Sequence, residues 1–355
     1  KNCGNCHPLI YQEWLADGHA RSATNPRFLS LYDGTNWHGE PDVSWGLLPD
    51  YPDAAGICTT CHAPAANLDD LAVGNIRQVE GVARRGVHCD FCHKIQDVTR
   101  ATVGLTHGRF GVQLLRPENG SLSFGPLDDV DIGTDSHLPL QSESLFCATC
   151  HEGIVFGVPV YTTYSEWLES PDRGLGRTCQ SCHMRPTGRM TNMAPRAGGI
   201  ERDPQTLATH SFLLEGGLES MLRDCLDLSL ECAPAADELH LSARISARNA
   251  GHRVPTGFID RHVLLVVEAF DANGTKLAAL EGPRLPAAAD DFSGESGQLF
   301  AKMLVDESGH GPIPFWHAAA EVRDTRLFPE EISVQEFRFP RRVTQFRARL
   351  IHRRF

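Results

Sequence analysis

Five copies of one short string account for most of the chemistry that this 355-residue chain could carry out. Each copy has the form Cys-x-x-Cys-His, and the copies begin at Cys3, Cys58, Cys89, Cys147 and Cys179. Two thiols three positions apart can reach the two vinyl groups on one edge of a porphyrin. The histidine that follows can then bind the iron from below. The string is the attachment signature of a c-type haem.

The pattern predicts five covalently held haem c groups, and five haems in one chain indicate electron transfer. The cysteines expected to form the thioether bonds are Cys3, Cys6, Cys58, Cys61, Cys89, Cys92, Cys147, Cys150, Cys179 and Cys182. The histidines expected to be proximal iron ligands are His7, His62, His93, His151 and His183.

Two other kinds of site use paired cysteines, namely zinc ribbons and disulfide frameworks. Neither gives a reason for a histidine directly after each second cysteine. The chain has 17 histidines in 355 residues, so five such placements by chance have a probability of roughly one in a million, and we predict haem.

The sixth position of each iron determines whether a haem carries electrons or binds a substrate. Histidines outside the motifs are the main candidates for it, because methionine is scarce. His88 directly precedes Cys89 and is expected to point at a neighbouring haem, which would bring two haems into close contact. The five strongest candidates are His19, His88, His137, His210 and His252, with His38 and His107 in reserve. Five candidates for five irons favour bis-histidine ligation throughout.

The motifs are confined to residues 3–183, about 37 residues per haem, which is too little chain for an ordinary apolar core. We therefore expect residues 1–215 to form a haem-packed, loop-rich, mainly short-helix multihaem cytochrome domain. Two short helices are predicted, at Leu9–Ala20 and Tyr161–Glu169. They share an echo, since Tyr11-x-Glu13-Trp14-Leu15 returns as Tyr164-x-Glu166-Trp167-Leu168.

Residues 216–355 have a different character and predict an all-β, sandwich-like domain of immunoglobulin-like size. The stretch Leu218–Leu230 is predicted as a helix that leads into it. Apolar and polar residues alternate over Glu238–Ala250, as in a half-buried strand, and again over 346–350. The segment His262–Phe270 is rich in valine and leucine, and the turn sequence 271–274 follows it.

Charge and hydropathy limit the partners. The chain has 33 Lys and Arg against 45 Asp and Glu, a formal charge of −12, which argues against nucleic acid and anionic membranes. No apolar run is long enough to span a bilayer. Thioether attachment takes place outside the cytoplasm, so we expect a periplasmic or extracellular protein whose export signal was removed or precedes Lys1. In that setting the remaining Cys225 and Cys232 form a disulfide or stay as buried thiols.

Several strings together resemble the multihaem cytochromes c related to the tetrahaem electron carrier of nitrifying bacteria. They are Cys3-Gly-Asn-Cys-His with the following Tyr-x-Glu-Trp and His19-Ala, Gly-Val-His88-Cys-Asp-Phe-Cys-His, Leu-Phe-Cys147-Ala-Thr-Cys-His-Glu, Thr-Cys179-Gln-Ser-Cys-His-Met, Thr-His210-Ser-Phe and Ala-Gly-His252-Arg-Val-Pro-Thr-Gly. The resemblance implies that His19, His88, His210 and His252, which lie in these strings, are distal ligands. The second Tyr-x-Glu-Trp helix departs from the first, because Asp172 stands where the first copy has His19.

That superfamily includes electron carriers, octahaem reductases and oxidases, and subunits of extracellular cytochrome filaments, so three functions stay open. The leading hypothesis is a non-enzymatic electron carrier whose partners are other redox proteins. A second is a reductase or oxidase of a small nitrogen or sulfur compound with one open haem, near Arg84, Arg85, His107 or Arg109, although pairing with haem propionates explains Arg84 and Arg85 better. A third is a subunit of a homo-oligomer, a filament or a membrane redox complex.

Overall fold

The computed structural model describes residues 2–35, 40–41, 45–66, 74–117, 122–130, 135–213 and 217–353. The chain divides into two compact units. The motif-bearing unit consists of Lys1–Gly153 and Arg177–Leu218, and the C-terminal unit of Ile154–Gly176 and Glu219–Phe355. The boundary expected at 215/216 lies outside the described residues. Residues 154–176 lie within the domain predicted at 1–215, but in the structure they group with the C-terminal unit.

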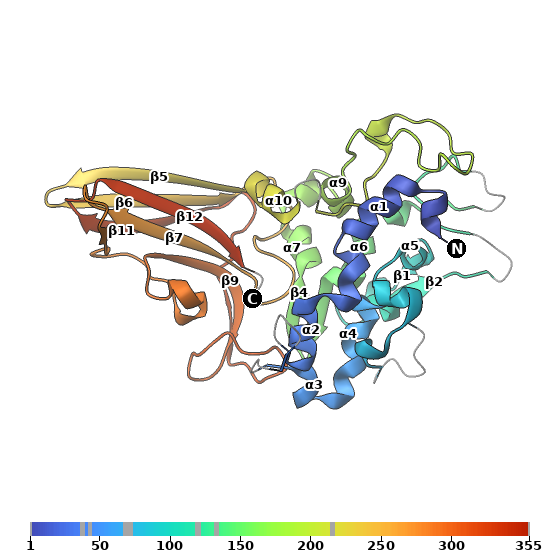
Figure 1. Ribbon diagram of the computed structural model, residues 1–355, viewed down its shortest axis with the longest axis horizontal. Coiled ribbons are helices and arrows are strands. Elements are labelled where there is room, and N and C mark those ends of the chain that lie inside the picture. The colour runs from blue at the N-terminus through green and yellow to red at the C-terminus, as the bar shows by residue number, and fades with distance from the viewer. Residues whose placement is uncertain are drawn as a thin grey trace. The chain divides into compact units, whose positions relative to one another are not determined.

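Short helices and loops make up most of the motif-bearing unit (Figure 1). Its α-helices are α1 (Pro8–Ala16), α2 (Pro26–Asp33), α3 (Leu47–Asp50), α4 (Ala55–His62), α5 (Cys89–Cys92), α6 (Leu145–His151) and α9 (Cys179–His183). Its 3-10 turns are η1 (Cys3–Asn5), η2 (His19–Thr24), η3 (Pro52–Ala54), η4 (Ile76–Gln78), η5 (Gly81–Arg85), η6 (Arg100–Thr102), η7 (Gly108–Gly111), η8 (Pro139–Ser142) and η9 (Pro204–Thr206). Strands β1 (Ile95–Val98) and β2 (Val112–Leu114) form an antiparallel pair.

The helix predicted at Leu9–Ala20 is shorter than expected. Helix α1 ends at Ala16, Asp17 is extended, and the chain resumes as the 3-10 turn η2 at His19. The Asp17 side chain accepts a hydrogen bond from the backbone N–H of His19 (2.9 Å). Such a local bond offers the backbone an alternative to the helical ladder, which explains the break.

Buried apolar clusters in the motif-bearing unit are small. The larger of two such clusters consists mainly of alanines around Tyr32 and Ile76, and the other groups Ile10 with Met190 and Leu207. This agrees in kind with the sequence argument that the region has too little chain for an ordinary core.

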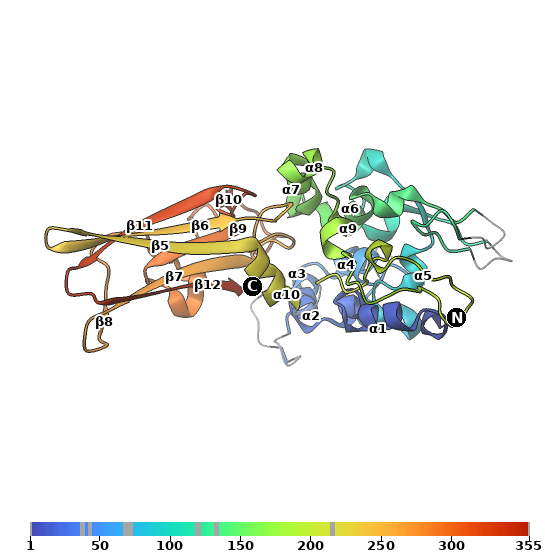
Figure 2. The same cartoon turned by 90° about the horizontal axis from the view of Figure 1, so that it is seen from above.

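The C-terminal unit is rich in β-structure (Figure 2). Its larger strands are β5 (Leu226–Ala235), β6 (Glu238–Ala247), β7 (His262–Phe270), β9 (Gly297–Val305), β11 (Ile332–Pro340) and β12 (Gln345–Arg353), with the short β8 (Lys276–Leu277) and β10 (Glu321–Asp324). One sheet has the order β11-β6-β5 and the other β10-β9-β7-β12, with β8 on β7. The unit also holds β4 (Val158–Thr162), which pairs with β3 (Glu152–Val155), and α7 (Thr163–Glu169), α8 (Pro171–Gly174), α10 (Gly217–Cys225) and η10 (Ala287–Phe292).

One apolar core contains residues from both sheets. The alternation predicted along β6 is confirmed, because Leu241, Ala243, Ile245 and Ala247 are fully buried on one face. Strand β7 has the predicted bounds and is buried on both faces. Its odd-numbered residues from 263 to 269 join the core shared with β6, and Leu264 and Val266 join a second cluster with Leu285 and Ala289. Burial on both faces explains why its sequence is apolar without alternation.

The helix predicted over Leu218–Leu230 is wrong in its second half. Helix α10 ends at Cys225, and strand β5 begins at Leu226. In β5, Leu226 and Leu228 lie opposite Ala247 and Ile245 and pack on the core. The two-residue spacing of these leucines follows the strand period, which the helical interpretation overlooked.

A disulfide between Cys225 and Cys232 does not fit this fold. Cys225 closes α10, Cys232 lies in the exposed middle of β5, and the two are not bonded to each other. Six strand steps separate Leu226 from Cys232, or about 20 Å, whereas a disulfide needs Cα atoms within about 7 Å of each other. The Cys225 thiol lies instead 3.6 Å from the carbonyl oxygen of Asn249.

A buried acid lies at the start of β7. Asp260 is only 5% exposed, and its Oδ1 has no hydrogen-bond partner. Burial raises its pKa to about 7 from 3.8, and the charge of Lys302 opposes the shift only in part. Because the folded pKa lies above the unfolded value, this group stabilises the fold at low pH, and stability is lost as the pH rises from about 4 to about 7.

We therefore predict that Asp260→Asn stabilises the protein at pH 8 by as much as about 4 kcal/mol and has little effect at pH 4. Asparagine also tolerates the positive φ (73°) at this position. Calorimetric unfolding of the full chain between pH 4 and 8 measures the difference. The exposed Asp237→Asn is the control. An equal effect of both substitutions, or no dependence on pH, would contradict the prediction.

Candidate functional site

Helical turns present the cysteines and the histidine of a motif together. Four of the motifs lie on or next to α4, α5, α6 and α9, and the first lies on η1 with His7 just before α1. Residues three and four apart lie on the same face of a helix. The two thiols and the imidazole of a motif are therefore directed to one side of the turn, as attachment to a single flat group requires.

Cysteines of different motifs lie close together. The Cys3 thiol interacts with that of Cys89, Cys61 with Cys150, and Cys147 with Cys179. All five motifs are thus linked to another motif in two groups, the first with the third and the second with the fourth and fifth. In the described part of the chain, no three His, Cys, Asp or Glu side chains are grouped so that they could hold a metal ion.

Four of the five motif histidines have Nδ1 within hydrogen-bonding distance of a backbone carbonyl oxygen. The pairs are His7 with Met193 (2.8 Å), His62 with Ser22 (2.9 Å), His93 with Phe124 (2.6 Å) and His183 with Phe212 (3.0 Å). A carbonyl can only accept, so the proton is on Nδ1 and the lone pair on Nε2. This is the arrangement by which proteins orient histidines that bind a metal through Nε2.

Burial keeps several of these imidazoles neutral. Desolvation lowers the pKa of His62 and of His93 below the ordinary 6.5, although the backbone carbonyl bonded to each opposes the shift. Burial likewise lowers the pKa of His210 to about 4, helped by the nearby His93. Neutral imidazole is the form that binds a metal.

Two of the predicted distal histidines lie opposite motif histidines. The ring centres of His19 and His151 are 6.2 Å apart, and those of His210 and His93 are 6.3 Å apart. Two imidazoles on opposite sides of one metal have centres about 6.2 Å apart, because each metal–nitrogen bond is about 2 Å and each nitrogen is about 1.1 Å from its ring centre. The separation of the ring centres in both pairs matches this value.

Carboxylates of the α1 region hold both of these distal candidates. Asp17 Oδ1 accepts from Nδ1 of His19 (2.8 Å), and its Oδ2 accepts from the backbone N–H of Phe212 (3.2 Å). Glu13 Oε2 accepts from the backbone N–H of His210 (2.8 Å). Burial opposes ionisation of Asp17, but its bonds with His19 outweigh burial and hold its pKa below the ordinary 3.8. Glu13 and Asp17 are not among the site residues predicted from the sequence. For Asp17, the Asp-x-His spacing indicates that its carboxylate could bind the imidazole of His19.

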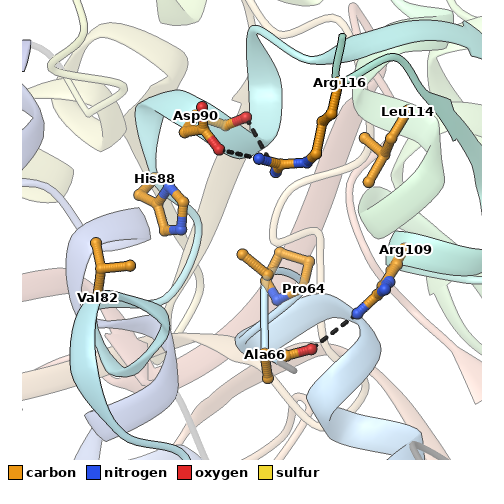
Figure 3. A pocket seen from close by; sticks show the side chains of 9 residues that line it. Pro64, Ala66, Val82, His88, Asp90, Arg109, Leu114 and Arg116 are labelled. Atoms are coloured by element: carbon orange, nitrogen blue, oxygen red, sulfur yellow. Dashed lines mark hydrogen bonds and ion pairs between the residues drawn. The ribbon is translucent and has the colours of Figure 1, made fainter. Parts of the chain in front are cut away.

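His88 faces a cavity of about 290 Å³ (Figure 3). Its Nε2 is buried without a hydrogen-bond partner, and burial lowers its pKa. Arg109 and Arg116 also line the cavity, where Arg109 donates to the Ala66 carbonyl (2.8 Å) and Arg116 forms an ion pair with Asp90. A basic, unpaired ring nitrogen beside two cations suits a metal-bearing group with acidic substituents.

The backbone before His88 is fixed by the α1 region. The Val87 N–H donates to the carbonyl of His19 (3.0 Å), and the Val87 carbonyl accepts from Trp14 Nε1 (2.8 Å). Gly86 has φ +77°, and a Cβ there would lie 2.6 Å from the carbonyl oxygen of His19. The segment leading to His88 thus packs directly on the segment that bears His19, and the glycine permits it.

The other candidates are placed as follows. His137 is exposed, and its backbone N–H donates to Asp135 (3.1 Å). His252 belongs to the C-terminal unit, with Nδ1 3.0 Å from the carbonyl oxygen of Arg253. His107 directly precedes η7. His38 lies outside the described residues.

The donor set fits haem c. Each motif offers two thiols and an imidazole on one side of a helical turn, the ring nitrogens are directed by carbonyls, and two further imidazoles stand at the separation that one metal requires. The buried, unpaired Nε2 of His88 is the kind of atom that a missing ligand partner leaves behind.

Comparison with known proteins places the fold and the first three motifs beside those of multihaem cytochromes c. Residues 2–94 match the family described as cytochrome c554 and c-prime. The chain has the fold of a penta-heme cytochrome c552 from Thermochromatium tepidum, with a TM-score of 0.68 and 23% sequence identity over 99% of this chain and 89% of that one. No curated protein matches the chain at a significant level. The more specific relation to octahaem enzymes or filament subunits stays a prediction.

Asp17 provides a test of the geometry around α1. Asp17→Ala would leave the Nδ1 of His19 and the backbone N–H groups of His19 and Phe212 without their acceptor. We expect it to destabilise the protein by about 2–4 kcal/mol at pH 7. The effect should fade as the pH falls below about 4, because a carboxyl with a lowered pKa stabilises the folded state only when it is ionised.

Denaturant unfolding at pH 7 and at pH 3 measures this difference. Asp53→Ala removes an exposed aspartate of η3 and is the matched control. A loss for Asp17→Ala no larger than that of the control would show that the contacts around Asp17 do not stabilise the fold.

Proposed function

We propose that this chain is an exported multihaem c-type cytochrome that carries electrons through five haem c groups, each with an imidazole on both faces. The observation that supports this most directly is the pair of opposed rings, His19 with His151 and His210 with His93, at 6.2 and 6.3 Å. A distal imidazole closes the position that a substrate would need, so the geometry favours electron transfer over catalysis at these two sites.

In this proposal the ten motif cysteines form the thioether bonds, and the five motif histidines bind iron from the proximal side. His19 serves the fourth motif and His210 the third, and His88, His137 and His252 are the distal ligands of the remaining three. His88 would coordinate through its unpaired Nε2. Nearby cations such as Arg109 would pair with haem propionates.

Bound haem would supply a one-electron redox couple, and the chain would fix the orientation of the imidazoles that hold it. Carbonyls and Asp17 fix the orientation of the imidazoles, which keeps the coordination geometry constant in both oxidation states. The contacts between Cys3 and Cys89, Cys61 and Cys150, and Cys147 and Cys179 bring neighbouring motifs together, which favours short transfer distances.

We further propose that the C-terminal unit is a β-sandwich that docks a redox partner. Its two sheets share one apolar core, as a sandwich requires. Export to the periplasm or the cell exterior follows from covalent haem attachment. Among the described residues no helix has both the length and the apolar character needed to cross a bilayer.

The number of haems is directly measurable. We expect the mass of the intact, denatured protein to exceed that of the polypeptide by five haem groups, and acid–ketone extraction to leave the pigment on the protein. Changing Cys58 and Cys61 together to alanine should remove one haem, because a single motif is lost. Fewer than five added groups in the unaltered protein, or extractable pigment, would contradict the proposal.

The distal roles of His19 and His210 predict a change in spin state. His19→Ala and His210→Ala should each convert one haem of five, about a fifth of the iron, to a high-spin form that binds carbon monoxide when reduced. Electron paramagnetic resonance and carbon monoxide difference spectra measure this. His310→Ala is the control, since the side chain of His310 is 84% exposed. High-spin haem already present in the unaltered protein would instead favour the enzyme hypothesis.

A further inference from the structure

We propose that Glu166 of α7 is a positioning residue that fixes the loop bearing His252, and thereby sets how firmly that imidazole stays on its iron. The inference rests on the proposed function, in which His252 is a distal ligand. It concerns residues 250–257, Ala-Gly-His-Arg-Val-Pro-Thr-Gly, and the side chains that hold them within the C-terminal unit.

One side of the loop is held by the segment 324–328. The backbone N–H of Val254 donates to the carbonyl of Leu327 (2.9 Å), and that of Leu327 donates back (3.0 Å). Nη1 of Arg326 lies 3.4 Å from the Pro255 carbonyl oxygen. The loop thus has a short two-stranded contact just after His252.

The other side is held by α7 and α8. Thr256 Oγ1 donates to Glu166 Oε2 (2.6 Å). Gly251 packs so closely that a Cβ there would lie 3.0 Å from Asp172 Oδ2 and 3.5 Å from Trp167 Cδ1. His252 is therefore flanked by two contacts with the same helical segment, one at the preceding residue and one at Thr256.

Glu166 is itself held in a buried charge network. It is 4% exposed, and its Oε1 accepts from Arg326 Nη1 (2.6 Å) and from Thr162 Oγ1 (2.6 Å). Arg326 also binds both carboxylate oxygens of Asp324 (2.9 and 2.7 Å). A buried ion pair contributes little net stability over a well-packed apolar pair. The network links α7 to the segment that bears Arg326, and it also holds the Glu166 carboxylate where that group accepts from Thr256.

The first unit has the same arrangement around the other copy of the echo. There Glu13 of α1 accepts from the backbone N–H of His210, the distal candidate for the third motif. In both copies of Tyr-x-Glu-Trp, the glutamate binds a loop that bears a candidate ligand. In the second copy of the string, Asp172 stands at the position that His19 has in the first. Asp172 packs against the loop at Gly251, whereas His19 is itself a candidate ligand. The shared string thus has a shared task, which is to hold a ligand loop.

The test uses the full-length holoprotein and three substitutions. Glu166→Gln removes the charge at nearly constant volume. Thr256→Val removes the hydroxyl that binds Glu166 and that lies 3.0 Å from Thr163 Oγ1, and Thr256→Ser restores that hydroxyl. The readout is carbon monoxide binding to the fully reduced protein, whose rate at a six-coordinate haem reflects how often the distal histidine leaves. Removal of a residue that orients a metal ligand typically weakens ligation about 10- to 100-fold.

We expect Glu166→Gln and Thr256→Val to speed carbon monoxide binding at one haem by about 10-fold or more, and Thr256→Ser to behave as the unaltered protein does. Glu219→Gln, which alters an exposed ion pair of α10, is the charge control. Circular dichroism and thermal unfolding confirm that each variant is folded. If Glu166→Gln does not fold, the two threonine substitutions carry the test.

His252→Ala separates the two levels of the argument. It should open one haem fully, and adding Thr256→Val to it should change nothing further. If His252→Ala opens a haem but Glu166→Gln and Thr256→Val do not, the positioning role is overturned and the ligand role stands. If His252→Ala opens no haem, His252 is not a ligand, and both claims about it are overturned.

Discussion

The hydrogen bond from an imidazole Nδ1 to a backbone carbonyl is the contact on which the arrangement of the motif histidines depends. It fixes the tautomer, the plane of the ring and the direction in which Nε2 points. The carbonyls come from Met193, Ser22, Phe124 and Phe212, at 29 to 186 positions along the chain from the histidines they bind. Each bond therefore fixes a distant loop as well as a ring. A change in the path of such a loop would rotate the imidazole that is bonded to its carbonyl.

This dependence explains how a unit with few regular elements keeps a defined shape. Among its described residues, one buried cluster consists mainly of alanines and another of only three buried residues, so packing of these clusters alone gives little restraint. Single side-chain contacts fix the path of the chain instead. Ser22 shows this clearly, because its carbonyl accepts from His62, while its hydroxyl lies 2.8 Å from the carbonyl oxygen of His62 and accepts from the Val87 N–H. One residue thus ties the second motif to the segment before the third.

The sequence predicted features that arise from local patterns and missed those that arise from distant contacts. The helices around Trp14 and Trp167 and the strands β6 and β7 follow from short-range spacing, and the structure contains them. The predicted helices at Leu9–Ala20 and Leu218–Leu230 are both longer than the observed ones. Asp17 ends the first, and the second gives way to strand β5, in which Leu226 and Leu228 pack on the core. The carbonyls that orient the imidazoles were not predictable, since any residue carries a carbonyl. The ligand assignment of His252 rests on the sequence resemblance, and that of His137 on its position ten residues before Cys147.

Residues 154–176 group with the C-terminal unit because of a contact between residues distant in the sequence, the ion pair of Glu166 with Arg326. Glu13 is only partly buried and accepts a backbone N–H, so it needs no cation. Glu166 is buried and does need one, because an uncompensated carboxylate in the interior is strongly destabilising. Arg326 supplies that charge, and Lys302 adds a second link by donating to Thr162 Oγ1 (2.8 Å) and to the Pro159 carbonyl (2.8 Å). Because buried Glu166 pairs with Arg326, helix α7 belongs to the C-terminal unit, although α7 lies between the fourth and fifth Cys-x-x-Cys-His motifs in the sequence.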